Sequence, residues 1–104
     1  MIFALLSATV LFAPPVVFVN VNVLPMDRDT VLRNQTVVIR GERIAAVGAM
    51  GKVQIPKDAI RIDGRQKFLM PGLVDMHVHV YAPQEFSLFL ANGVTTVYNL
   101  NGRP

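Results

Sequence analysis

The stretch FLMPGLVDMHVHV, Phe68–Val80, carries the pattern that decides the fold. It contains a Pro-Gly turn signal at Pro71–Gly72, followed by a valine-rich run that is long enough for a β-strand and too short for a typical helix. Successive side chains of a strand point to opposite faces, so His77 and His79 project the same way and Asp75 shares their face. The pattern predicts a strand with one apolar face and one face that carries Asp-His-His.

Two histidines at this spacing can hold one metal ion from one side. Neutral imidazole suits zinc and also nickel, iron and copper, and a catalytic zinc site usually has about three protein ligands plus a water. A His-x-His pair alone is a weak signal, because such histidines are more often ordinary core or surface residues. The turn before the strand, the carboxylate on the same face and the helix-like segment after the strand favour a metal site at His77 and His79.

The sequence before this strand predicts a small antiparallel β unit. Residues 16–26 predict a strand, because Val19, Val21 and Val23 alternate there with Asn20 and Asn22 at period two. Residues 35–40 and 43–47 predict a hairpin, with Gly41 first in the two-residue turn as a type II′ turn prefers. Residues 60–63 predict a further short strand. We find no catalytic constellation in this part of the sequence.

The sequence after the His strand predicts a helix and a second strand. Residues 83–90 carry apolar side chains at helical spacing, with Phe86 and Phe89 interpreted as core packing, and Asn92–Gly93 follows as a stop signal. Residues 94–100, VTTVYNL, predict the second strand. Such a βαβ unit implies two parallel strands joined by a right-handed crossover.

Composition places the chain among small globular proteins. At 104 residues it is one small domain or part of a larger one, and its 52% apolar content argues against intrinsic disorder. The ten Lys and Arg residues are scattered among acidic ones, so the net charge of +3 gives no reason to expect a nucleic acid partner. Because the chain has no cysteine, disulfides and thiolate zinc sites are excluded.

Residues 1–13, MIFALLSATVLFA, form an uncharged apolar run that ends at Pro14–Pro15. A membrane-spanning helix needs roughly 20 apolar residues, so no stable membrane span is expected. The length suits the apolar core of a secretory signal peptide, although no basic residue precedes it and no clean A-x-A site follows. Residues 1–15 are interpreted as a signal-peptide remnant of a secreted or periplasmic protein, with a β-strand or an apolar leader of a cytoplasmic protein as alternatives.

The sequence PGLVDMHVH at residues 71–79 resembles the first barrel strand of the amidohydrolase superfamily of metal-dependent hydrolases. The segments VVIRGERIAAVGAM and LANGVTTVYNLNG are also similar to that family, in particular to its imidazolonepropionase-like branch. The resemblance implies a β-rich α/β fold. Residues 16–70 would form an antiparallel portion of a composite β-sandwich, and residues 71–104 the first strand-helix-strand of a (β/α)8 barrel. A complete barrel usually takes about 250 residues, so we interpret the chain as an N-terminal fragment of an enzyme.

The resemblance also implies a chemistry. In the family the two histidines of this strand bind the metal, and His77 and His79 occupy those positions. The implied reaction is hydrolysis of a non-peptide or cyclic amide C–N bond in a small-molecule substrate, by a water that Zn²⁺ or another divalent metal activates. The family's bridging lysine or glutamate, two further histidines and aspartate lie on later strands, so no catalytic residue is assigned in this chain. With two ligands, the chain alone is expected to bind metal weakly and to be inactive.

Several residues near the histidines have more than one interpretation. Asp75 is expected to form structural hydrogen bonds, because it precedes His77 while barrel sites open at the C-terminal ends of the strands. Asn99, Asn101 and Arg103 are expected to be solvated loop residues, with substrate contact as the alternative. The rival to a hydrolase is a small non-catalytic β-rich binding or structural module with incidental histidines. The sequence leaves the substrate and a homo-oligomeric state open.

Overall fold

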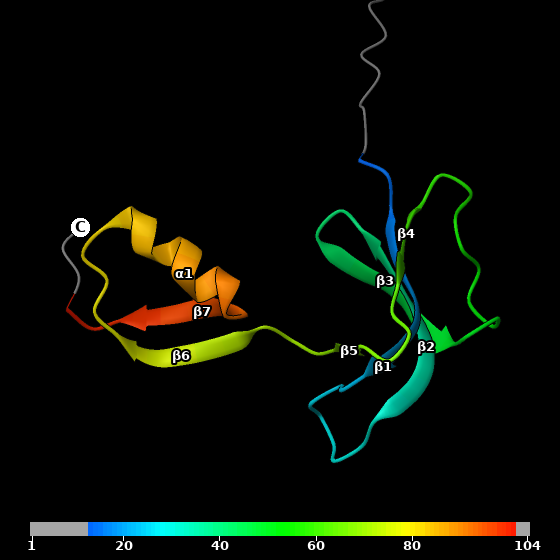
Figure 1. Cartoon of the computed structure of the whole chain (residues 1–104), viewed down its shortest axis with the longest axis horizontal. Coiled ribbons are helices and arrows are strands. Elements are labelled where there is room, and N and C mark those ends of the chain that lie inside the picture. Colours follow the sequence, from blue (N-terminus) through cyan, green and yellow to red (C-terminus); the bar gives the residue numbers. More distant parts are fainter. Residues whose placement is uncertain (1–12, 102–104) are drawn as a thin grey trace, which may run out of the picture. The chain divides into compact units, whose positions relative to one another are not determined.

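A computed structural model describes residues 13–101, and the chain divides into two compact units (Figure 1). The first unit is Met1–Leu69, and its described part, residues 13–69, contains five strands, which are β1 (Val16–Val23), β2 (Leu32–Arg40), β3 (Arg43–Ala49), β4 (Ile60–Asp63) and β5 (Phe68–Leu69). The second unit, Met70–Pro104, contains strand β6 (Leu73–Val78), the 3₁₀ turn η1 (Pro83–Glu85), helix α1 (Phe86–Ala91) and strand β7 (Val94–Asn99).

The apolar run interpreted as a signal-peptide remnant lies almost wholly outside the described residues. Over residues 13–101, no helix reaches the length and apolar character needed to cross a membrane.

The first unit is built on one five-stranded sheet in which β3, β2, β1 and β4 lie in that order and β5 also pairs with β1. Strands β1, β2 and β3 are antiparallel, as the hairpin pattern predicts. Strands β4 and β5 instead run parallel to β1, so the sheet is mixed and the prediction of a wholly antiparallel unit is wrong. The reason is the long connection over residues 50–59, because only a tight hairpin forces the next strand to reverse direction.

The valine–asparagine alternation of β1 forms a strand with an irregular register. The register against β2 shifts on both sides of Val21, and Asn20 has a positive φ of 60°. Asparagine tolerates this left-handed conformation better than most residues do, so it suits a β-bulge. Val17 and Val21 still point into the core of the unit, where Val37 and Val38 of β2 are buried with them.

The second unit is a strand-helix-strand unit, as the sequence predicts. Strands β6 and β7 pair in parallel, and helix α1 connects them and packs beside β7 (Figure 1). The helical segment begins as a 3₁₀ turn at Pro83, and the Glu85 carboxylate accepts a hydrogen bond of 3.0 Å from the N–H of Ala82, which is half of a capping box. It ends at Asn92, and Gly93 follows with a φ of 78°, the left-handed conformation expected of a helix stop.

Burial in the second unit is less extensive than the apolar pattern predicts. Of the valines and the methionine opposite the histidines, Val78 and Val80 are 6% and 4% exposed, whereas Met76 is 62% exposed. Phe86 is also exposed, so its interpretation as a core residue is wrong for the described structure. One helix and two strands offer too few neighbours to cover both faces of a parallel sheet.

Candidate metal centre

Strand β6 and the residues just beyond it position the two histidines. His77 lies within β6 and His79 lies one residue past its end, and both side chains are exposed. The neighbours Val78 and Val80 are buried. The alternation predicted from the sequence therefore holds over residues 77–80, with apolar side chains on one side and imidazoles on the other.

The two imidazole rings approach each other through their Nε2 atoms. The Nε2 atoms of His77 and His79 are 3.3 Å apart, whereas the ring centroids are 5.3 Å apart and the ring planes differ by 24°. The rings therefore lean toward one another at their Nε2 ends. A tetrahedral zinc ion with Zn–N bonds of about 2.0–2.1 Å separates two ligand nitrogens by about 3.3–3.4 Å. The pair has the donor atoms and the spacing for two positions of one such ion.

The same distance has a second physical explanation. If one imidazole carries its proton on Nε2 and the other does not, the two nitrogens can share a hydrogen bond without any metal. The geometry alone is compatible with both a metal-binding pair and a hydrogen-bonded pair.

Asp75 and Tyr81 contact the two histidines from either side along the chain. The Asp75 carboxylate accepts a hydrogen bond of 3.1 Å from the backbone N–H of His77, which is the kind of structural role expected for it. The Tyr81 hydroxyl lies 3.5 Å from Nδ1 of His79, with the two rings edge to face. A hydrogen-bonding partner at the outer ring nitrogen is typical of metal-binding histidines.

Asn99 holds the chain directly after His79. Its side-chain Oδ1 accepts a hydrogen bond of 3.1 Å from the N–H of Val80, and its Nδ2 donates one of 3.2 Å to the carbonyl oxygen of Val80. Of the three residues expected to be solvated or to touch substrate, Asn99 thus bonds to the chain itself, Asn101 is exposed, and Arg103 lies outside the described residues. The sequence offers one signal for this role, an amide side chain at the end of the strand that follows the histidines.

The histidine pair is not part of a larger ligand cluster in the described part of the chain. Among residues 13–101, no group of three or more His, Cys, Asp or Glu side chains is placed to hold a metal ion. The pair supplies two imidazole nitrogens, whereas a catalytic zinc site usually has about three protein ligands.

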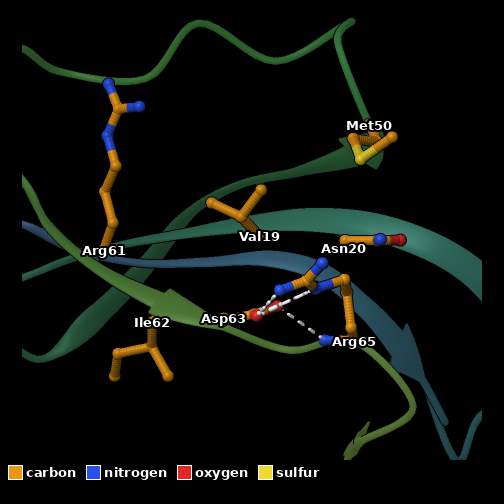
Figure 2. Close-up of a pocket in the computed structure, with 7 residues that line it drawn as sticks. All are labelled: Val19, Asn20, Met50, Arg61, Ile62, Asp63 and Arg65. Carbon is orange, nitrogen blue, oxygen red and sulfur yellow. Dashed lines mark hydrogen bonds and ion pairs between the residues drawn. The ribbon is translucent and has the colours of Figure 1, made fainter.

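The first unit contains a shallow hollow of about 370 Å³ (Figure 2). Its polar lining includes Asp63 and Arg65, which form an ion pair of 2.7 Å, and that hydrogen-bonded guanidinium keeps the pKa of the Asp63 carboxyl below its usual value. The complete lining is Val19, Asn20, Met50, Arg61, Ile62, Asp63 and Arg65. This set includes no histidine, and its carboxylate is already paired, so we assign no catalytic role to the hollow.

Comparison with known proteins identifies relatives over most of the chain. The chain is 35% identical over 89 residues to an adenine deaminase of Staphylothermus marinus, a match that covers 79% of this chain and 15% of the deaminase. It is 42% identical over 60 residues to a dihydroorotase of Anaeromyxobacter sp. strain K, covering 57% of this chain and 13% of the dihydroorotase. The chain thus spans less than a fifth of the length of these relatives. No protein-family model matches it.

A solved structure has the same fold. The D-hydantoinase (dihydropyrimidinase) of Thermus sp. aligns with a TM-score of 0.65 and 24% identity, over 79% of this chain and 19% of that protein. At this identity the likeness shows a shared β-rich fold over the aligned residues and carries no statement about function. The relatives in sequence and this neighbour in structure are members of one superfamily. The chain belongs to the amidohydrolase superfamily and is a partial representative of it.

Proposed function

We propose that this chain forms part of a metal-dependent hydrolase that cleaves a C–N bond, in a non-peptide or cyclic amide, of a small molecule. The observation that carries the proposal is the 3.3 Å approach of the His77 and His79 Nε2 atoms on one exposed face. The named relatives in sequence, a deaminase and a dihydroorotase, are hydrolases that act on C–N bonds.

In this proposal each histidine contributes its Nε2 lone pair to a divalent metal, with zinc the expected ion. The metal supplies Lewis acidity and makes a bound water acidic enough to act near neutral pH. Asp75 holds the backbone of His77, and Tyr81 contacts the outer nitrogen of the His79 ring. The remaining ligands and the proton-transfer group come from the rest of the enzyme.

We further propose that β6, α1 and β7 are the first strand-helix-strand of a (β/α)8 barrel, and that residues 16–70 belong to its composite β-sandwich. The parallel pairing of β6 with β7 supports this assignment. In such a barrel the functional groups gather at the C-terminal ends of the strands. His77 and His79 lie at that end of β6, as the proposal requires.

The test uses the complete protein that contains this chain, stripped of metal with a chelator and then titrated with zinc. We expect zinc to restore hydrolysis of cyclic amides such as dihydroorotate or a hydantoin. Losing a residue that supports a metal ligand typically weakens metal binding about 10- to 100-fold. Because His77→Ala and His79→Ala each remove a ligand itself, we expect each to weaken zinc binding by more than that. Gln84→Ala, an exposed residue of η1, is the matched control and should bind zinc normally.

Wild-type protein with no zinc affinity, or histidine variants that bind zinc as the wild type does, would contradict the proposal. Either result would favour the rival explanation, in which the two imidazoles share a hydrogen bond in a non-catalytic module.

A further inference from the structure

We propose that Asn99 is a positioning residue for the metal centre, which fixes His79 by holding the backbone of Val80. This inference rests on the proposed function, because it assigns Asn99 a role in presenting a metal ligand. Asn99 does not contact the imidazoles in this role. It acts through the main chain of the residue that follows His79.

The contact is specific, because a side-chain amide has one acceptor and one donor group that match the two polar groups of a peptide backbone. Oδ1 of Asn99 accepts from the N–H of Val80 at 3.1 Å, and Nδ2 donates to its carbonyl oxygen at 3.2 Å. Both bonds are partly buried, and the Val80 side chain is almost wholly buried. Partly buried backbone groups that lose such partners are unfavourable, so the two bonds should hold Val80 in place.

Asn99 also sits where the backbone ladder between the two strands ends. Val78 is the last residue of β6 and pairs with Asn99, and the N–H of Leu100 donates a hydrogen bond of 3.0 Å to the carbonyl oxygen of Val78. Within the described residues, Val78 and Asn99 are the last pair in the register of β6 with β7. From there the Asn99 side chain continues the attachment between the two segments, through its two hydrogen bonds to the backbone of Val80.

This attachment determines the position of His79. Its two chain neighbours, Val78 and Val80, are each tied to the end of β7 by hydrogen bonds and each buried. A residue whose two chain neighbours are both held has little freedom in its own backbone, so the direction of its side chain is restricted. The His79 ring then lies beside the His77 ring, with the two centroids 5.3 Å apart. Without the bonds from Asn99, the chain after His79 would be restrained by the buried Val80 side chain and by the hydrogen bonds from the Tyr81 and Ala82 N–H groups to the Glu85 carboxylate, none of which holds the Val80 peptide groups.

The experiment compares variants of the complete protein in the absence of substrate. In Asn99→Ala we expect the zinc dissociation constant, measured by competition with a chromophoric chelator, to rise about 10- to 100-fold. Asn99→Asp keeps the acceptor for the Val80 N–H but places a carboxylate oxygen against the Val80 carbonyl oxygen, so it should also raise the zinc dissociation constant above that of the wild type. The visible absorption of bound Co²⁺, which reports ligand geometry, should change in Asn99→Ala.

Two controls separate positioning from general stability. Asn101→Ala removes an exposed amide two residues away and should leave zinc affinity and the Co²⁺ spectrum unchanged. Val94→Ala removes apolar volume at the opposite end of β7, so it should lower the unfolding temperature while leaving zinc affinity unchanged in folded protein.

The possible failures are distinguishable. If His77→Ala abolishes zinc binding while Asn99→Ala binds as the wild type does, the positioning role is wrong and the proposed function stands. The positioning role is also wrong if Val94→Ala weakens zinc binding as much as Asn99→Ala does. If the wild type binds no zinc, the proposed function fails and this inference fails with it.

Discussion

At the scale of single residues, the Asp63–Arg65 pair is the best-defined electrostatic feature of the described chain. The Arg65 guanidinium contacts the Asp63 carboxylate at 2.7 Å through Nη2, and its Nε lies 2.9 Å from Oδ2. The backbone N–H of Arg65 donates a further bond of 3.0 Å to Oδ1. Because both side chains are exposed, the pair is expected to contribute little to folding stability.

The pair nevertheless changes the acidity of the Asp63 carboxyl, and this change can be tested. The side-chain hydrogen bond from Arg65, followed by its backbone bond, keeps the pKa of Asp63 below the usual value for aspartate. The small stabilisation is therefore complete above the usual aspartate pKa and is lost as the pH falls through the lowered one. Changing Arg65→Ala should raise the pKa of Asp63 toward its usual value, as followed by NMR titration of the carboxyl carbon.

The matched control for this prediction is Arg61→Ala, which removes a cation from the same strand. It should leave the pKa of Asp63 nearly unchanged, because Arg61 is not among the groups that lower it. An equal rise in both variants would show that the general positive field, rather than the Arg65 hydrogen bonds, sets the acidity.

Sequence reasoning at this scale predicted some features of the site and missed others. The period of a strand is enough to place His77 and His79 on one face, because that placement depends only on local backbone geometry. The bonds from Asn99 to Val80 depend on which residues of β6 and β7 lie opposite one another. That register is set by the pairing of two separate strands, so the sequence shows an amide at the end of β7 but does not show which residue it bonds to.

At the scale of elements, Gly72 shows why the turn before the His strand needs a glycine. A Cβ atom at Gly72 would overlap the side chain of Thr95, including its Oγ1, Cγ2 and Cβ atoms. Thr95 lies on β7 and Gly72 precedes β6 by one residue, so the missing side chain lets the two strands begin their pairing.

Changing Gly72→Ala should therefore destabilise the β6–β7 unit, since overpacking at a close contact typically costs about 1–3 kcal/mol. Thr95→Ala removes two of the overlapping atoms, so the double variant should regain part of the loss. Thermal unfolding of the complete protein in a double-mutant cycle measures this coupling. Additive effects of the two changes would contradict the steric explanation.

The layout of elements follows the sequence where local signals are strong. The strands of the first hairpin, the helix stop at Gly93 and the strand after it all occur as predicted. The parallel direction of β4 and β5 was missed, because the sequence of a short strand does not encode the direction of its neighbour. The burial predicted for Phe86 was also missed, because it depends on elements that would pack against α1.

At the scale of the whole molecule, large apolar side chains are exposed in both units. In the first unit they include Ile44 and Phe68, and in the second Met76, Leu88 and Leu90. Soluble monomers rarely expose contiguous apolar patches of more than a few hundred Å². A two-stranded parallel sheet is also marginally stable by itself, because both its faces normally need cover.

These surfaces and the two-ligand site together predict how the 104-residue chain behaves when it is produced alone. We expect it to bind a hydrophobic dye such as ANS strongly and to unfold with low cooperativity, because the second unit has little buried apolar surface of its own. We also expect weak zinc binding and no hydrolysis of dihydroorotate or hydantoins, because a catalytic zinc site usually needs about three protein ligands. The complete protein is the control, and it should show weak dye binding and zinc-dependent turnover. Zinc-dependent turnover by the 104-residue chain itself would show that His77 and His79 form a working centre without ligands from elsewhere. It would contradict the proposal that the remaining metal ligands and the proton-transfer group come from the rest of the enzyme.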